Sequence, residues 1–140
     1  MTECSLCSGV AWRVAHGLHW STVINRDQRL LGKSMLVLNR HSEDVTGLTD
    51  DEWLSLRRDL AATKRALDEL LQPDHYNLLF LMNVDRHVHL HIWPRYRSRR
   101  TWQGMDYEDP DFGSQCNASP RTMKDEDLEQ LRTALHERLR

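Results

Sequence analysis

The sequence lacks long hydrophobic runs, and this absence excludes a membrane-spanning helix. Among its 140 residues the longest uninterrupted apolar stretch is 78–82, whereas a helix that crosses a bilayer needs about 20 apolar residues. The first residues also lack the basic-then-apolar pattern of a secretory signal peptide. Internal repeats and low-complexity linkers are absent as well. The length suits one packed domain, which we expect to span residues 1–140.

Cysteine and excess charge are also scarce. The three cysteines are an odd number, which does not suit the disulfide framework of a secreted protein. The net charge of −2 arises from 19 basic and 21 acidic residues, which argues against a protein that coats nucleic acid. We therefore expect a cytoplasmic protein with no membrane or nucleic-acid partner. Histidine is plentiful by contrast, with 8 in the chain.

Hydrophobic patterning predicts strands that pair in an antiparallel sheet. The clearest candidates are residues 18–24, 34–39, 76–83 and 86–94. Only Val84 and Asp85 separate the last two, which favours a tight hairpin and antiparallel pairing.

Two helices are predicted around these strands. Thr49 and Glu52 have the spacing of a capping box, and apolar residues then recur at helical spacing until Pro73. A long helix is therefore expected at about residues 50–71. A polar, turn-rich segment precedes a second predicted helix over 123–139. This order of elements is typical of an α+β fold rather than of βαβ winding.

The most informative segment is 87–93, His-Val-His-Leu-His-Ile-Trp. Because side chains alternate between the faces of a strand, His87, His89 and His91 are expected on one face. Residues four apart on a strand are separated by about 13 Å, which is too far for His87 and His91 to share one metal ion. The two outer histidines must therefore have different roles. Imidazole suits several, because it titrates near neutral pH, attacks as a nucleophile and binds metals.

Two asparagines are candidate phosphate contacts beside the histidines. Asn77 and Asn83 lie on or near the neighbouring predicted strand, and their even spacing places both on one face if the strand is regular. The alternative is that they are ordinary turn residues, and Asn83 in particular could begin the hairpin.

Cys4 and Cys7 have the Cys-x-x-Cys spacing of a zinc site. One such pair supplies only two of four ligands, so free thiols or a redox pair are alternatives. The redox interpretation is disfavoured because no βαβ pattern follows the pair.

The histidine segment resembles the motif His-φ-His-φ-His-φ-φ, with φ hydrophobic, of the histidine triad (HIT) superfamily of nucleotide hydrolases and transferases. The Pro-Arg that follows at 94–95 and the Leu-x-Asn at 81–83 are similar to the family's flanking residues. The segments 32–41 and 48–52 resemble its strand that ends in a histidine and the start of its long helix. The resemblance covers about residues 4–96 and implies an α+β HIT-like fold, with an antiparallel sheet of about five strands, one long helix and a C-terminal helix.

Residues 97–140 form a C-terminal extension to this resemblance, and they could cap the active site, contact a dimer mate or bind another partner. The basic run 95–100 is either a solvated loop, paired with the acidic stretch after it, or a phosphate contact.

The resemblance implies a nucleophilic mechanism. His89 would attack the α-phosphorus of a nucleotide and form a nucleotidyl-histidine, which water then cleaves. A backbone carbonyl would accept a hydrogen bond from the N–H at the other nitrogen of His89 and orient the ring. His91 would hydrogen-bond the phosphate or the leaving group. Because transferring relatives often carry Gln at that third position, His91 favours hydrolysis of a nucleoside phosphoramidate or dinucleoside polyphosphate.

The resemblance also implies ligands and an assembly. Cys4, Cys7, His41 and His87 would hold a structural zinc ion, because four protein ligands close its coordination shell. Asp27 is the acid expected to contact the ribose of the nucleotide. Relatives are commonly homodimers.

Two other functions remain open from the sequence. One is a metal-dependent hydrolase in which His87 and His89 hold a catalytic zinc with an open position. The other is a nucleotide-binding module without turnover.

Overall fold

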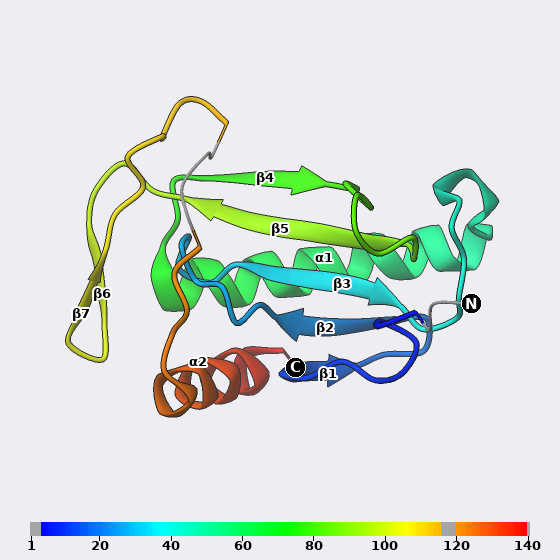
Figure 1. Ribbon diagram of the computed structural model, residues 1–140, viewed down its shortest axis with the longest axis horizontal. Coiled ribbons are helices and arrows are strands. Elements are labelled where there is room, and N and C mark those ends of the chain that lie inside the picture. The colour runs from blue at the N-terminus through cyan, green and yellow to red at the C-terminus, as the bar shows by residue number, and fades with distance from the viewer. Residues whose placement is uncertain (1–3, 116–119, 140) are drawn as a thin grey trace.

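A computed structural model describes residues 4–115 and 120–139. Five strands form one antiparallel sheet in the order β1-β2-β3-β5-β4, and two more form a separate ribbon that projects from one end (Figure 1). The strands of the sheet are β1 (Arg13–His16), β2 (Trp20–Ile24), β3 (Ser34–Leu38), β4 (His75–Leu79) and β5 (His89–Arg95). The antiparallel sheet with its two helices confirms the α+β class expected from the sequence.

The long helix α1 (Asp50–Leu71) confirms the predicted one. The residues predicted to begin and to end the helix do so in the structure. The Thr49 hydroxyl accepts a hydrogen bond from the Glu52 amide at 3.1 Å, and the Glu52 carboxylate accepts one from the Thr49 amide at 2.8 Å. At the other end Gln72 adopts the left-handed conformation, with φ of 52°, immediately before Pro73. A short 3-10 helix, Val45–Gly47, precedes α1.

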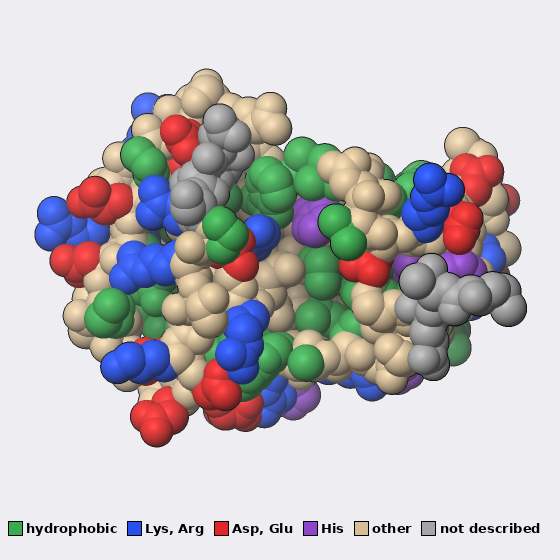
Figure 2. Space-filling model, in the orientation of Figure 1, with side chains coloured by type: hydrophobic (Ala, Val, Ile, Leu, Met, Phe, Trp, Pro, Cys, Tyr) green, Lys and Arg blue, Asp and Glu red, His purple; other side chains and the backbone are tan. Residues whose placement is uncertain are grey.

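Helix α1 lies behind the sheet in Figure 1 and covers one of its faces. Its buried Leu67 and Leu71 pack in one core with Leu36 and Ile92 of the sheet. Gly32 permits this approach: a Cβ there would lie 2.8 Å from both leucines, and its φ of +85° is strained for other residues. The opposite face of the sheet carries His89 and His91, and we call it the histidine face. In the described part of the chain no helix covers that face (Figure 1). Figure 2 shows the molecule from the same side, with a histidine side chain visible near its middle.

The connection between β4 and β5 corrects one expectation. The two strands pair antiparallel as predicted, but β4 ends at Leu79 and β5 begins at His89, so residues 80–88 replace a tight two-residue hairpin. The end of this connection joins β3 instead of β4. The Val88 amide donates to the Ser42 carbonyl at 2.8 Å, and the Val88 carbonyl accepts from the Leu38 amide at 3.1 Å.

Three further elements complete the fold. The short β1 was not predicted, and neither was the ribbon of β6 (Arg100–Trp102) and β7 (Met105–Tyr107), which lies in the segment expected to be turns. The C-terminal helix α2 (Asp125–Arg138) was predicted and buries Leu128, Leu131 and Leu135. Among the described residues, neither helix is sufficiently long and apolar to cross a membrane.

Candidate functional site

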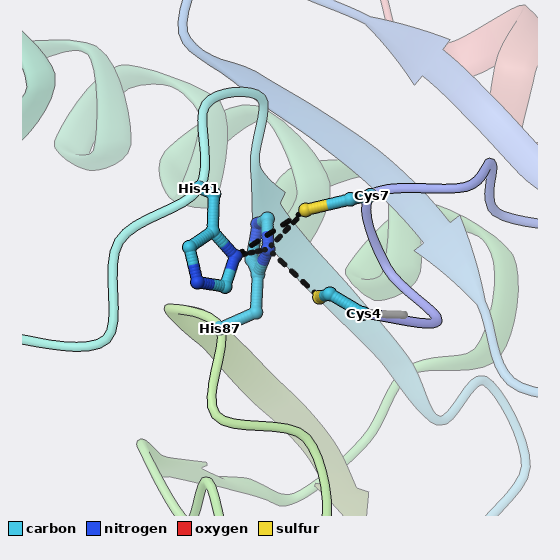
Figure 3. A group of neighbouring side chains, drawn as sticks. All are labelled: Cys4, Cys7, His41 and His87. Atoms are coloured by element: carbon cyan, nitrogen blue, oxygen red, sulfur yellow. Dashed lines mark hydrogen bonds between the residues drawn. The ribbon is translucent and has the colours of Figure 1, made fainter. Parts of the chain in front are cut away.

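Four side chains from three distant segments converge at one end of the sheet. Cys4 and Cys7 come from the N-terminal turn, His41 follows β3, and His87 precedes β5 (Figure 3). The Cys7 sulfur lies 3.3 Å from Nδ1 of His41 and 3.4 Å from Nδ1 of His87. The Cys4 sulfur lies 3.4 Å from the same atom of His87, and the two Nδ1 atoms are 3.3 Å apart. We call these four residues the metal cluster.

The spacing of the metal cluster fits a tetrahedral zinc ion. Bonds of about 2.3 Å to sulfur and 2.0–2.1 Å to nitrogen imply sulfur–nitrogen separations of about 3.6 Å and a nitrogen–nitrogen separation of about 3.3 Å. The observed separations of 3.3–3.4 Å are close to both values. Two thiolates and two imidazoles are also the donor set of many structural zinc sites.

In both histidines of the metal cluster an oxygen atom lies near Nε2, so Nδ1 is the nitrogen that is available to a metal. Nε2 of His87 donates to the Leu38 carbonyl at 2.7 Å, and Nε2 of His41 lies 3.5 Å from the Glu43 carboxylate. Such partners orient histidine ligands in metal sites. Burial lowers the pKa of His87, which favours the neutral form that binds metals. The cluster could therefore bind zinc through four protein ligands.

His89 begins β5 beside the metal cluster but is not part of it. Its Nδ1 donates to the backbone carbonyl of His87 at 2.6 Å, so the neutral ring carries a lone pair on Nε2. That Nε2 lies 3.1 Å from Nε2 of His91. The structure thus does not bring His87 and His89 together as two ligands of one metal ion.

Burial is the main cause that lowers the pKa of His91 to about 4, and the charges of His89 and Lys33 add to the shift. His91 is therefore neutral near pH 7. A neutral His91 can donate through Nε2 towards the lone pair of His89, which leaves its own Nδ1 without a proton. Within the described residues that Nδ1 is buried and has no hydrogen-bond partner.

A polar row crosses the histidine face next to His91. The backbone amide of Asn25 donates to the Lys33 carbonyl at 3.0 Å. The Lys33 ammonium lies 5.2 Å from the centre of the Trp93 ring, and Trp93 on β5 is opposite Asn77 on β4. Trp93 also contacts His91 edge to face, with ring centres 5.9 Å apart. We call Asn25, Lys33, Trp93 and Asn77 the polar row.

Two members of the polar row have unused hydrogen-bonding atoms. Among the residues that the structure describes, Asn25 Oδ1 and Trp93 Nε1 are buried without a partner, as is Nδ1 of His91. Buried polar atoms are normally paired, so a group of unpaired ones indicates a surface that a ligand completes. Asn25 was not among the site residues predicted from the sequence. The missed signal was its even spacing from Val23 on the predicted strand, and its place next to Lys33 depends on the strand order.

Asp27 has a different environment from the one expected of a ribose contact. Its carboxylate accepts hydrogen bonds from the amides of Arg29 at 3.0 Å and Arg121 at 2.9 Å, and it pairs with Lys33 at 3.1 Å. Burial alone would raise its pKa, but these hydrogen bonds and the lysine lower it. Asp27 therefore anchors the segment that leads into α2, and its contact with ribose stays a prediction.

The two predicted asparagines differ in placement. Asn77 lies on β4, where its side-chain oxygen accepts a hydrogen bond from Arg95 at 2.6 Å. Asn83 is exposed in the connection between β4 and β5, because β4 ends before it. The strand that would carry both on one face therefore does not reach Asn83, which agrees with the alternative of a residue in the connection. The contact of either asparagine with phosphate stays a prediction.

The basic run 95–100 is engaged within the fold. The Arg95 guanidinium is buried against Asp109 at 2.7 Å. Arg99 pairs with Asp106 and Glu108, both at 3.2 Å. The pairing of this run with the acidic stretch after it agrees with the structural alternative stated above.

Comparisons with known proteins place the fold. The sequence matches no protein-family model and no curated protein. A hypothetical histidine triad nucleotide-binding protein from Sulfolobus tokodaii has a similar structure, with a TM-score of 0.73 and 18% identity over 97% of this chain and 91% of the other. A histidine triad protein from Bradyrhizobium japonicum gives 0.71 and 19%, over 91% and 89% of the two chains.

A zinc-bound histidine triad family protein from Mycobacterium smegmatis is also similar, with a TM-score of 0.65 and 18% identity over 96% of this chain and 94% of the other. At these identities the likeness shows the fold. The protein therefore has the HIT fold that its histidine motif predicted.

Proposed function

We propose that the protein is a nucleotide hydrolase that acts through a nucleotidyl-histidine and releases a nucleoside monophosphate. The observation that supports this most is the arrangement of His89. The hydrogen bond of 2.6 Å to the His87 carbonyl holds the proton on Nδ1, so Nε2 keeps a lone pair beside the polar row. An imidazole that is held in this orientation beside His91 suits attack on phosphorus.

The reaction proposed for this site has two displacement steps. Nε2 of His89 attacks the α-phosphorus, a nitrogen–phosphorus bond forms, and the bond from phosphorus to the leaving group breaks. The leaving group departs with the electron pair of that bond and takes a proton from solvent. His91 then no longer donates to the lone pair of His89, and its Nε2 proton can hydrogen-bond the leaving atom or a phosphate oxygen. Water attacks the phosphorus of the intermediate and releases a proton to solvent. The nitrogen–phosphorus bond breaks, its electron pair returns to Nε2 of His89, and the monophosphate is the product.

The metal cluster would support this chemistry from a distance. Zinc held by Cys4, Cys7, His41 and His87 would have no open position, so its contribution would be to join the N-terminal turn to the sheet. His87 links the two sites, because its side chain belongs to the cluster and its carbonyl orients His89. We infer that the cluster positions the nucleophile.

The polar row would bind the nucleotide. Asn25 Oδ1 needs a hydrogen-bond donor, such as a ribose hydroxyl, and the Trp93 indole needs an acceptor. Asp27 would act on this contact indirectly, by holding Lys33 and the chain around it in place. Asn77 would act in the same manner through Arg95, and Asn83 remains a candidate for the phosphate.

The charges near the polar row favour a phosphoramidate over a dinucleoside polyphosphate. A cavity of about 640 Å³ adjoins Trp93 and extends over Asn77 to residues 112–115. Lys33 of the polar row and Arg95 of the cavity lining are already paired with Asp27 and Asp109. A polyphosphate leaving group would compete with these carboxylates, whereas an amine would not.

A turnover assay tests the proposal. Zinc-loaded protein is incubated with adenosine and guanosine phosphoramidates and with diadenosine polyphosphates, beside His89→Ala and the exposed-histidine control His16→Ala. We expect nucleoside monophosphate from the wild type and from His16→Ala, and none from His89→Ala. Full activity of folded His89→Ala would contradict the nucleophile, and AMP binding without turnover of any substrate would favour a binding module. Gel filtration of the same protein tests the expected homodimer.

A further inference from the structure

A second groove lies on the α1 side of the sheet, with a volume of about 910 Å³. One wall is the exposed stripe of α1 over residues 54–65, and the other is the hairpin of β1 and β2. Leu139, which follows α2, closes part of the groove. Trp20 lies at its base and donates to the Glu52 carbonyl at 2.9 Å, so this groove is on the face of the sheet opposite the histidine face. We call it the arginine groove.

Three arginines of α1 line the arginine groove. Arg57 and Arg65 are eight positions apart with Ala61 midway, so Arg57, Ala61 and Arg65 follow one i, i+4 ridge of the helix, along which the two arginine positions differ by about 80° around the axis. A helix rises 1.5 Å per residue, which separates the two arginine positions by about 12 Å along the axis. Ala61 and Ala62 leave space between the arginine side chains. The stripe therefore presents cations at both ends of a shallow floor.

The charge of the arginine groove is unbalanced. Among the described lining residues Asp59 is the only carboxylate, whereas three arginines line the groove. Burial raises the pKa of Asp59, although the charges of Arg58 and His19 act in the opposite direction. In residues 4–115 and 120–139 no ion pair joins Arg57 or Arg65 to a carboxylate. This local positive charge contrasts with the net charge of −2 for the chain.

We propose that the arginine groove binds a linear polyphosphate, either inorganic or carried by a nucleoside triphosphate. Guanidinium groups pair with phosphate oxygens through two parallel hydrogen bonds. A chain of three phosphoryl groups spans part of the distance between Arg57 and Arg65, so both can bind it without converging on one point. Such an anion also relieves the repulsion between like charges on one helix face. This site is independent of the proposed activity.

Calorimetric titration at low ionic strength tests the site, with zinc-loaded protein and inorganic tripolyphosphate as the ligand. Orthophosphate is the comparison for length, and ATP added in the presence of saturating AMP is the comparison for source. We expect tripolyphosphate to bind about tenfold or more tightly than orthophosphate, because it engages both ends of the stripe. Equal binding of tripolyphosphate and ATP would assign recognition to the phosphates, and tighter binding of ATP would assign the nucleotide as the source. No tripolyphosphate binding would overturn the site.

Two groove variants and two controls locate the binding. Arg57→Gln/Arg65→Gln should weaken tripolyphosphate binding about tenfold or more, because it removes two charged hydrogen-bond donors. Ala61→Leu should also weaken it by filling the floor, with no change in charge. The control Arg97→Gln/Arg99→Gln removes the same charge at the β6–β7 end and should bind as the wild type does.

The second control separates the two faces of the sheet. His89→Ala should bind tripolyphosphate normally, and Arg57→Gln/Arg65→Gln should retain wild-type turnover and melting temperature. Unchanged affinity in both groove variants, or affinity lost in His89→Ala, would overturn the proposal. Binding of a single-stranded oligonucleotide without binding of tripolyphosphate would do the same, because it would identify a different class of ligand.

Discussion

The metal cluster and the histidine face place histidines four positions apart in contrasting environments. His87 has partners at both ring nitrogens, since Nδ1 faces the cluster and Nε2 donates to the Leu38 carbonyl. His91, among the described residues, has a buried Nδ1 with no partner. The cluster is thus complete within the chain once a metal is added, whereas the histidine face needs a larger ligand. We infer that the first mainly stabilises the protein and the second mainly serves its chemistry.

The paired variants His87→Ala and His89→Ala test this difference most strongly. His89→Ala should lower turnover by about 10³-fold or more, because the nucleophile is removed, and it should keep zinc and a wild-type melting temperature. His87→Ala should lose zinc, thermal stability and activity together. Zinc content, calorimetric melting and turnover measured on the same preparations decide the matter. Equal loss of zinc in the two variants would show that the sites are not separate.

Removal of zinc should have the next largest effect. A chelator is expected to lower the melting temperature by about 10 °C or more, because the cluster joins three segments of the chain. Activity should fall with it and return when zinc is added. His41→Ala should reproduce the loss of stability, and the exposed His16→Ala should not. A chelated protein that melts normally but is reversibly inactive would instead favour a catalytic metal.

Acid should weaken the element that carries His41 into the cluster. The hydrogen bond from Arg40, together with the Thr49 amide, lowers the pKa of the buried Glu52 from 4.5 to about 2, although burial opposes the shift. A depressed pKa stabilises the fold above pH 4.5, and this stabilisation is lost as the pH falls towards 2. Because Arg40 is partly exposed, we expect about 1–2 kcal/mol rather than the full value of the shift.

Denaturant unfolding between pH 6 and 3 measures this contribution. The matched comparison is Arg40→Gln, in which the decline in the free energy of unfolding over that interval should be smaller. Acid also releases metal from the cluster in both proteins, so the difference between them isolates the ion pair. Identical pH profiles of the two proteins would show that the ion pair of Arg40 and Glu52 does not contribute to the loss of stability in acid.

Substitution in the polar row should have the smallest effect. Asn25→Ala should raise KM about five- to tenfold with little change in kcat, because one hydrogen bond to the bound nucleotide is lost. Trp93→Phe keeps the ring and removes the indole donor, and we expect a similar but smaller change. Titration with AMP provides the direct measurement. An unchanged KM and AMP affinity in both variants would show that the unpaired atoms do not contact the ligand.

The parts of the fold that could be predicted from the sequence are those encoded by neighbouring residues. The bounds of α1 were predicted because Thr49, Glu52 and Pro73 act on the adjacent backbone. The ribbon of β6 and β7 was missed, since its strands are short and its turn depends on Gln103 and Gly104, both with positive φ. The connection over 80–88 was predicted to be too short, because pairing of Val88 with Leu38 and Ser42 requires contacts from elsewhere in the chain.

The sequence by itself determined that histidines two positions apart share a strand face, because the alternation of side chains is a local property of extended backbone. The four proposed metal ligands came from a resemblance, and only the tertiary structure showed that their atoms lie within 4.8 Å of one another. The polar row and the arginine groove were likewise visible only in the tertiary structure. Asn25 and Trp93 lie on either side of Lys33 because β3 is placed between β2 and β5. That strand order is decided by long-range packing against α1, which no local pattern of residues encodes.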